Sequence, residues 1–198
     1  MSAASRTALV AATGWAVLVP VGCYTSHQDF ADGGADELVT ADASTCDGTW
    51  RDPTTGYLWE NPPLETLRTW DDAVAYCNGL TLCDYRAGGW HLPTIDGLRS
   101  LIRGCPDTMP GGACRVTESC LDLSCFSERC GDCEYLRGPG PGGYYWDAAL
   151  GDSPGSSWSS SSEAGDFPRA WFVLFNFGMV NGGDKALPGW VRCVHTGS

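Results

Sequence analysis

Residues 69–79 read TWDDAVAYCNG and have the pattern of a short amphipathic helix. Thr69 is placed as the N-cap, with Asp72 at the third helical position, and Gly79 is placed to end the helix. Apolar residues recur at the spacing of one helical face, namely Trp70, Ala73, Val74 and Cys77. We therefore expect this face to lie in the core of the domain.

Residues 88–104 read GGWHLPTIDGLRSLIRG and predict a second helix. Thr94 is placed as its N-cap, and Gly104 follows its last turn. Gly97 weakens this helix by up to about 1 kcal/mol relative to alanine. One face is again apolar, with helical spacing between Ile95, Leu98, Leu101 and Ile102.

Strand patterns lie on both sides of these helices. Residues 56–60 (GYLWE) predict a first strand, which ends at Asn61-Pro62-Pro63 because proline cannot donate to a strand ladder. Large apolar residues occupy both alternating faces from 171 to 177, before Gly178, and predict a strand buried on both sides. Two further predictions are a turn at residues 181–184 (NGGD) and a last strand at residues 190–194 (WVRCV). Helices early and strands late, joined by long loops, predict an α+β domain.

Composition limits the partners and the compartment. The 198 residues are enough for one domain, or at most two. Twelve Lys and Arg residues stand against 24 Asp and Glu residues, and the formal net charge of −12 argues against a nucleic-acid partner. Eleven cysteines in so short a chain predict an oxidising compartment.

The N-terminal segment, residues 1–22, is typical of a signal peptide, because an apolar run follows the single base Arg6. This run has about 15 residues, fewer than the roughly 20 that span a membrane. It ends LVPVGC, which resembles the lipobox of bacterial lipoproteins and makes Cys23 the expected lipidation site. Residues 23–45 are then a flexible, lipid-anchored tether, and residues 46–198 are the folded domain. Ordinary cleavage nearby, which gives a secreted protein with an unpaired Cys23, is the alternative.

Residues 104–143 hold six cysteines, eight glycines and four prolines, but only seven large apolar residues. Burial cannot organise such a segment, so we expect disulfides to do so, each contributing about 2 to 4 kcal/mol. The sequence does not choose among the pairings of these six cysteines. With Cys23 lipidated, ten cysteines remain for disulfides: Cys46, Cys77, Cys83, Cys105, Cys114, Cys120, Cys125, Cys130, Cys133 and Cys193.

An ordered set of short stretches resembles the Lcl C-terminal domain family, which is found in bacterial surface proteins and lipoproteins. These stretches are DPTTGYLW (52–59), TWDDAVAYC (69–77), GWHLPT (89–94), LRSL (98–101), WSSS (158–161), AWFVLF (170–175) with Gly178, and VRCV (191–194). The resemblance spans about residues 52–195. It departs from the family at His91 and His195, where arginine is usual, at Gly97, where glutamate is usual, and in the expanded segment 104–143. We therefore carry no ligand contact over from those positions.

The family is similar to the C-type-lectin-like fold and to the formylglycine-generating enzyme fold, in which strands from the two ends of the domain pair. The resemblance thus implies a C-type-lectin-like domain with two helices, a small antiparallel sheet, long loops and a disulfide-rich insertion. In lectin-like domains a cysteine of the first helix bonds to the last strand. That similarity implies the pair Cys77–Cys193, and Cys46 and Cys83 are then left for each other.

The lipobox, the tether, the crosslinked domain and the lack of a catalytic set together predict a binding or adhesion module of the bacterial cell envelope, held at the membrane by its N-terminal lipid. Its ligand would be a surface glycan or a protein. Members of the family have been linked to sulfated glycans, but the negative charge of this chain opposes an anionic glycan unless its arginines form a local patch. The arginines available for such a patch are Arg99, Arg103, Arg115, Arg129 and Arg137.

No catalytic residues are expected. Residues 151–155 (GDSPG) match the Gly-x-Ser-x-Gly pattern, but no strand precedes the serine and no helix follows it. Cys130 and Cys133 form a C-x-x-C pair inside a cysteine cluster, where structural disulfides are favoured over zinc or redox chemistry. A catalytic triad would have to draw on three histidines, which are His27, His91 and His195. A diverged enzyme of the formylglycine-generating type and a purely structural envelope protein remain as alternatives.

No cofactor and no metal site are expected either. Three acidic residues in loops rich in Gly and Ser, namely Glu163, Asp166 and Asp184, are the candidates for binding calcium. The sequence contains no spaced calcium loop and lacks the sugar motif of calcium lectins. Tryptophans could stack on a sugar, but six lie in the framework stretches and most are expected in the core: Trp59, Trp70, Trp90, Trp158, Trp171 and Trp190.

Overall fold

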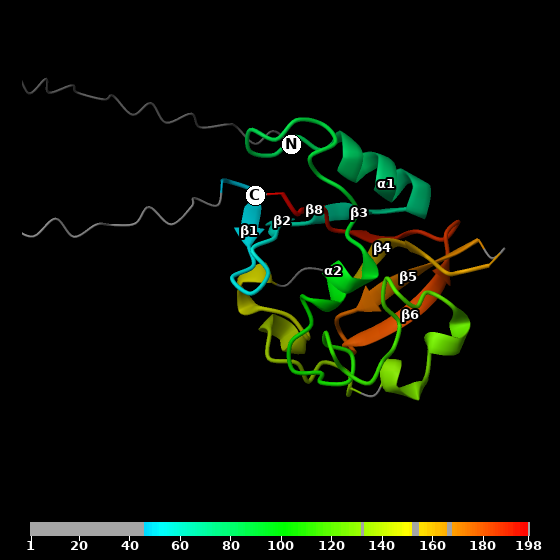
Figure 1. The fold of residues 1–198 in the computed structure, drawn as a ribbon. Helices are drawn as coiled ribbons and strands as arrows, with labels where there is room; N and C mark the ends of the chain where they lie inside the picture. Colours follow the sequence, from blue (N-terminus) through cyan, green and yellow to red (C-terminus); the bar gives the residue numbers. More distant parts are fainter. Residues whose placement is uncertain (1–45, 132, 152–154, 166–167, 198) are drawn as a thin grey trace, which may run out of the picture. The chain divides into compact units, whose positions relative to one another are not determined.

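The computed structural model describes residues 46–131, 133–151, 155–165 and 168–197 (Figure 1). The expected signal peptide, the lipidation site Cys23 and the tether lie outside these residues. Among the helices of the described ranges, none has the length and apolar character needed to cross a membrane.

The described domain is α+β, with short helices and short antiparallel strands. The α-helices are α1 (Trp70–Gly79) and α2 (Ile95–Arg99), and the 3-10 helices are η1 (Leu123–Cys125), η2 (Glu128–Cys130), η3 (Pro141–Gly143) and η4 (Ala148–Leu150). The strands form three sheets: β1 (Thr49–Arg51), β2 (Leu58–Glu60) and β8 (Val194–His195); β3 (Leu64–Arg68) and β7 (Gly189–Val191); and β4 (Ser156–Ser162), β5 (Arg169–Leu174) and β6 (Met179–Asp184). Strands from the two ends of the described chain therefore pair in the first sheet (Figure 1).

Both helices begin at the predicted caps. The Thr69 hydroxyl accepts a hydrogen bond from the Asp72 backbone nitrogen (3.4 Å), and the Thr94 hydroxyl accepts one from the Gly97 backbone nitrogen (3.1 Å). The second helix is shorter than predicted, because it ends at Arg99 and the chain continues in tighter turns. Its predicted apolar face is nevertheless fully buried, at Ile95, Leu98, Leu101 and Ile102.

The predicted turn at residues 181–184 is wrong, because these residues belong to strand β6. The chain turns instead at Gly178, whose φ is 58°. Gly183 has a different role, since a Cβ at this position would lie 3.0 Å from Phe172 and 3.1 Å from Trp158. The packing of two aromatic rings, and not a turn, therefore requires this glycine.

Strand β5 is shorter and less completely covered than predicted. It ends at Leu174, so the prediction of a strand through residue 177 is wrong. One face is buried, with Trp171 and Val173 at 0% exposure, whereas Phe172 on the other face is only half-buried. The prediction of burial on both sides fails because the face of Phe172 borders a cavity.

The predicted last strand is two strands, β7 and β8, which belong to different sheets. Arg192 and Cys193 lie between them. Cys193 is bonded to Cys77 of α1, and the Arg192 guanidinium donates to the Glu60 backbone oxygen (2.9 Å). These contacts hold the junction in the interior at the point where the chain changes sheets.

Disulfides organise residues 104–143 together with one buried arginine. The bonds in this segment are Cys105–Cys133, Cys114–Cys130 and Cys120–Cys125. The guanidinium of Arg99 donates to the backbone oxygens of Thr108, Met109 and Val116 at 2.6 to 2.9 Å. Val116 itself has no exposed surface. The expectation that disulfides alone organise the segment is therefore incomplete.

Two further disulfides join other parts of the domain. Cys77 bonds to Cys193, and Cys46 bonds to Cys83. These are the two pairs that the family resemblance implies. All ten cysteines of the described residues are thus in disulfides.

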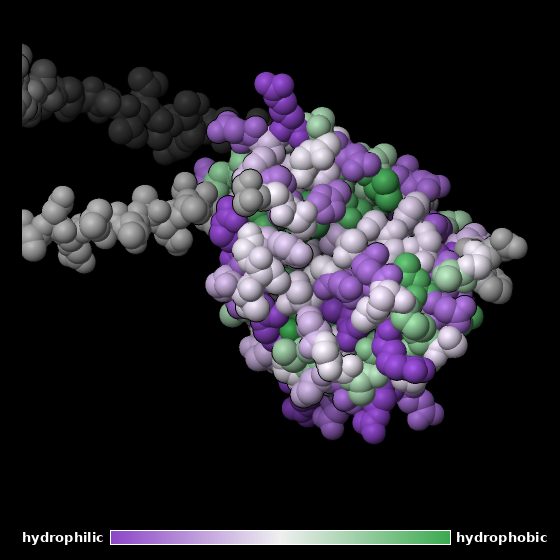
Figure 2. Space-filling view, viewed as in Figure 1, coloured by the Kyte–Doolittle hydropathy of each residue, from purple (hydrophilic) through white to green (hydrophobic). Residues whose placement is uncertain are grey.

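Buried side chains form two core clusters. The larger cluster includes Trp59 and Trp171 and the buried face of α2, and the smaller includes Trp90 and Trp158 with the inner face of α1. On the face shown in Figure 2, hydrophobic residues form small, separate patches. An apolar ligand would therefore find little area on this face and would need a cavity.

Candidate functional site

The sheet of β4, β5 and β6 carries an aromatic pair on one face. Trp158 of β4 lies opposite Phe172 of β5 in the strand register, and their rings meet edge to face with centroids 5.5 Å apart. The Trp158 indole nitrogen donates to the Arg68 backbone oxygen of β3 (3.3 Å), which fixes the plane of the ring. Gly183 of β6 leaves room beside both rings. The pair therefore forms a rigid apolar floor.

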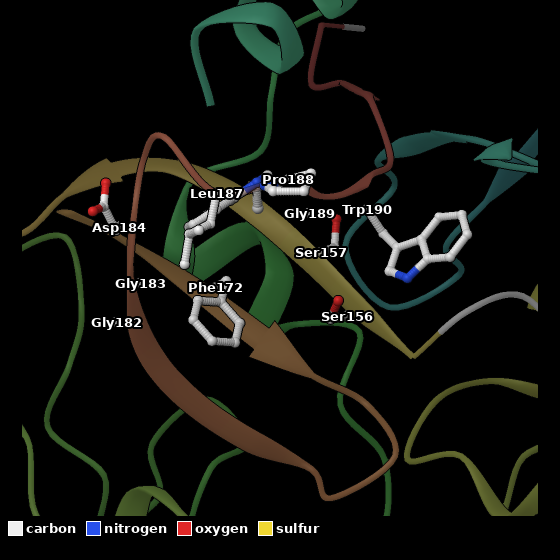
Figure 3. Close-up of a pocket in the computed structure, with 11 residues that line it drawn as sticks. Ser156, Ser157, Phe172, Gly182, Gly183, Asp184, Leu187, Pro188, Gly189 and Trp190 are labelled. Atoms are coloured by element: carbon white, nitrogen blue, oxygen red, sulfur yellow. The ribbon is translucent and has the colours of Figure 1, made fainter. Parts of the chain in front are cut away.

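The chain between β6 and β7 closes over this floor and leaves a cavity of about 240 Å³ (Figure 3). Gly189 approaches so closely that a Cβ there would lie 2.3 Å from the Trp158 indole nitrogen. Leu187 forms part of the wall and is 61% exposed. This cavity, the aromatic pocket, is lined by Ser156, Ser157, Trp158, Phe172, Gly182, Gly183, Asp184, Leu187, Pro188, Gly189 and Trp190.

The two ends of the aromatic pocket differ in chemistry. Figure 3 shows Asp184 at one end and Ser156, Ser157 and Trp190 at the other, with apolar side chains between them. A carboxylate attracts positive charge, whereas serine hydroxyls can donate or accept hydrogen bonds. The pocket thus suits a ligand with an apolar body and a polar group that reaches one of its ends.

A smaller cavity adjoins the serine end of the pocket. Ser156, Ser157 and Trp190 line both cavities. The smaller one has a volume of about 10 Å³, room for one water-sized group. The other residues that line this inner chamber are Pro63, Leu64, Trp146, Phe175, Val191 and Arg192.

Arg192 brings a buried positive charge to the inner chamber. It is 3% exposed, and its Nη1 donates to the Glu60 backbone oxygen (2.9 Å) and to Asn61 Oδ1 (3.3 Å). Its Nη2 has no hydrogen-bond partner among the described residues, and the same holds for the buried Oγ of Ser157. Burial lowers the pKa of Arg192 to about 10, so the guanidinium stays protonated at neutral pH.

The Glu60 carboxylate is the acidic group whose charge acts on Arg192, but its oxygens accept hydrogen bonds from Tyr76 and Cys193. Its Oε2 accepts a hydrogen bond from the Cys193 backbone nitrogen (3.1 Å), and its Oε1 accepts one from the Tyr76 hydroxyl. Burial raises the pKa of Glu60, and burial together with the Glu60 hydrogen bond raises the pKa of Tyr76. Among the described residues, no carboxylate lies within 4.0 Å of the Arg192 guanidinium nitrogens as an ion pair.

The acidic residues considered as calcium ligands do not form a common site in the described structure. Glu163 is buried and pairs with Arg169 (Oε2 to Nε, 3.2 Å), whereas Asp184 lies at the aromatic pocket. Asp166 lies outside the described residues. Within the part of the chain that is described, no three His, Cys, Asp or Glu side chains are grouped as a metal ion requires.

The candidates for catalysis are placed in the framework or fall outside the described residues. The backbone of His91 pairs with Val194, and the ring of His195 lies 2.7 Å from a backbone oxygen. The two cysteines of the C-x-x-C pair bond to different partners, so neither is a free thiol. His27 and residues 152–154 of the GDSPG motif lie outside the described ranges.

Each of the five arginines considered for binding an anionic glycan contacts a different partner within the domain. Arg99 is buried among backbone oxygens, and Arg115 donates to the Ser124 backbone oxygen (3.1 Å). The other three form ion pairs: Arg103 with Asp52 (3.3 Å), Arg129 with Asp107 (3.1 Å) and Arg137 with Glu134 (3.8 Å). Three of the five are thus balanced by a neighbouring carboxylate. This arrangement gives no reason to assign sulfated glycans as the ligand.

The aromatic pocket is not evident from the sequence. Trp59, Trp90 and Trp171 are fully buried, and Trp158 is 4% exposed and belongs to the smaller core cluster, as expected for framework tryptophans. Trp158 and the half-buried Trp190 also line the pocket. The double glycine in β6 is the one local signal, because two residues without side chains beside an aromatic strand leave space for rings.

Comparison with known proteins gives one match. The model of the Lcl C-terminal domain family matches residues 48–195, a range that contains every residue lining the pocket and the chamber. Neither a curated protein nor a solved structure matches the chain.

Proposed function

Because the chain belongs to the Lcl C-terminal domain family, we propose that it is a non-enzymatic binding module that captures its ligand in the aromatic pocket. The observation that carries this proposal is the preformed cavity with a rigid aromatic floor and polar ends. Concave, mostly apolar sites with a few placed polar groups are the usual form of a small-ligand site.

The proposed scaffold is C-type-lectin-like. Two contacts support it: the pairing of β2 with β8, and the disulfide between Cys77 of α1 and Cys193 beside β8. The first joins strands from the two ends of the domain and the second joins the first helix to the C-terminal end, as the lectin-like resemblance implies. The loops are then free to carry the ligand site, and the β6–β7 connection is the loop that closes the pocket.

The five disulfides of the described domain indicate an oxidising environment. We propose that the protein acts at the bacterial cell envelope, on the extracytoplasmic side, and that a lipid on Cys23 holds it at the membrane. Secretion is the alternative. A surface glycan or a group on a neighbouring protein would then reach the pocket without crossing a membrane.

The non-enzymatic part of the proposal rests on sulfur chemistry. A relative of the formylglycine-generating enzyme needs a reactive thiol, and the described cysteines are all bonded in pairs. Counting thiols in the native protein tests this point. We expect none in residues 46–198, and a reactive thiol there would favour the enzyme.

Binding in the pocket is tested with Leu187→Asp, which places a charge in the exposed wall without removing a core contact. Ligands come from arrays of neutral and sulfated glycans, with and without calcium, and from a panel of small organic molecules. We expect the variant to bind its ligand at least about tenfold more weakly, which corresponds to about 1.4 kcal/mol.

The matched control is Leu123→Asp, because Leu123 is 45% exposed in η1 and does not line the pocket. It should bind as the unmodified protein does. Equal binding by both variants would place the site elsewhere. The absence of any ligand would favour a purely structural envelope protein.

A further inference from the structure

The inner chamber indicates which class of ligand the aromatic pocket accepts. We propose that the ligand is a small monocarboxylic acid whose apolar body lies on Trp158 and Phe172. Its carboxylate reaches round the edge strand β4 and places one oxygen against Arg192 and Ser157, whose side chain lies on the opposite face of that strand. This inference rests on the proposed binding function and adds the chemistry of the bound molecule.

Unpartnered polar atoms in the chamber call for a hydrogen-bond acceptor. Among the residues that line the chamber, three buried polar atoms have no hydrogen-bond partner in the described structure: Arg192 Nη2, Ser157 Oγ and Trp146 Nε1. Buried polar groups nearly always find a partner in protein, water or ligand, because leaving them unpaired is costly. A guanidinium nitrogen can only donate, and a serine hydroxyl can donate as well. The missing group is therefore an acceptor.

The charge of Arg192 favours a negative acceptor over a neutral one. The guanidinium is buried, protonated at neutral pH and without an ion pair within 4.0 Å among the described residues. The carboxylate of Glu60 accepts its hydrogen bonds from Tyr76 and Cys193, and it acts on Arg192 only as a nearby charge. A hydrogen bond from a guanidinium to any acceptor is strengthened by its charge, and a carboxylate adds the direct attraction between opposite charges in a buried site. The negative net charge of the chain opposes this contact little, because distant surface charges are screened.

The sizes of the two cavities divide the ligand into a body and a single polar end. An apolar cavity of about 150 Å³ binds benzene, so the pocket volume of about 240 Å³ admits an aryl group or a short branched chain. The chamber volume of about 10 Å³ admits one oxygen.

Asp184 limits the ligand to one carboxylate. It lies at the end of the pocket opposite Ser157, as Figure 3 shows. A second carboxylate on the ligand would face this side chain and be repelled. A dicarboxylic acid is therefore disfavoured.

The test compares three molecules of one shape: 3-phenylpropionate, the neutral 3-phenylpropionamide and the cationic 3-phenylpropylamine. Each is titrated into the disulfide-bonded protein by calorimetry. We expect the carboxylate to bind at least about tenfold more tightly than the amide. Equal affinity would mean that the chamber holds water only, and would overturn the acid class while leaving the pocket as a binding site. Binding by none of the three would overturn the acid class, and the Leu187 experiment would then decide the proposed function separately.

Ser157→Ala tests the chamber without disturbing the fold, because its hydroxyl has no partner to lose. We expect this variant to bind 3-phenylpropionate about two- to tenfold more weakly. Ser160→Ala, on the same strand but in the lining of neither cavity, is the control and should bind normally. Arg192→Lys should reduce the preference for the carboxylate over the amide. Unchanged affinity in Ser157→Ala would contradict the proposal even if the Arg192 variant fails to fold.

Discussion

Buried arginines of this domain differ in how fully their donors are used. Arg99 is 2% exposed and gives its guanidinium donors to three backbone oxygens of the cysteine-rich segment. Arg192 is equally buried, but one of its nitrogens has no partner. Both residues therefore stabilise the fold, but Arg192 also keeps one donor that the described residues do not use.

Replacing Arg99 with methionine should destabilise the domain. The change keeps an apolar side chain in place but leaves three buried backbone oxygens without donors, so the free energy of unfolding should fall by about 3 kcal/mol or more. Chemical denaturation measures this change. Arg115→Met is the control, since that side chain makes one exposed hydrogen bond and its loss should cost less than about 0.5 kcal/mol. Similar losses in both variants would contradict the role given to Arg99.

The pKa of His91 links stability to pH. Burial, and then the neighbouring charge of His195, lower this pKa below the ordinary value of 6.5. The unfolded chain then binds a proton more readily than the folded one, so the free energy of unfolding should fall as the pH drops through about 6.5. Comparing the unmodified protein with His91→Gln between pH 8 and pH 5 isolates this contribution. A difference between the two proteins that does not depend on pH would contradict it.

At the level of elements, local signals explain which predictions succeed. The caps Thr69 and Thr94 are in place because capping depends on residues three apart in the chain. The turn predicted at residues 181–184 fails because the glycines there serve rings on other strands. Strands β1, β3 and β4 were not predicted either. β3 pairs with the distant strand β7, whereas β1 and β4 pair with the next strand along the chain, and their short or serine-rich sequences lack the alternating apolar pattern that predicts a strand.

The disulfides should differ in strength according to the loop that each closes. Cys77–Cys193 spans 116 residues and Cys120–Cys125 spans five. In the chain-entropy model, replacing the first pair with alanines should cost about 4 to 5 kcal/mol, and replacing the second about 2 kcal/mol. Urea unfolding of the two double variants measures both. A larger loss for the short loop would show that contacts made by the cysteines outweigh chain entropy.

At the level of the whole molecule, composition and local patterns predicted different properties. Cysteine content indicated the oxidising compartment and the disulfide-rich insertion, the order of helix and strand patterns indicated the α+β class, and the ordered motifs indicated the family. The proposed binding site could not be predicted from the sequence, because its residues come from β4, β5, β6, the chain between β6 and β7, and β7 itself. Trp158 and Trp190 lie in framework stretches like those of the core tryptophans, so the sequence around them does not mark them as pocket residues.

Tryptophan indole signals report directly on where a ligand binds. The chain has nine tryptophans, and two of the pocket residues are Trp158 and Trp190, whose N–H signals can be assigned with phenylalanine variants. On titration with 3-phenylpropionate or with any ligand found by screening, NMR spectra should show shifts of these two signals, while that of Trp59, which has no exposed surface, stays in place. Shifts confined to other indoles, with Trp158 and Trp190 unchanged, would show that the pocket is not the binding site.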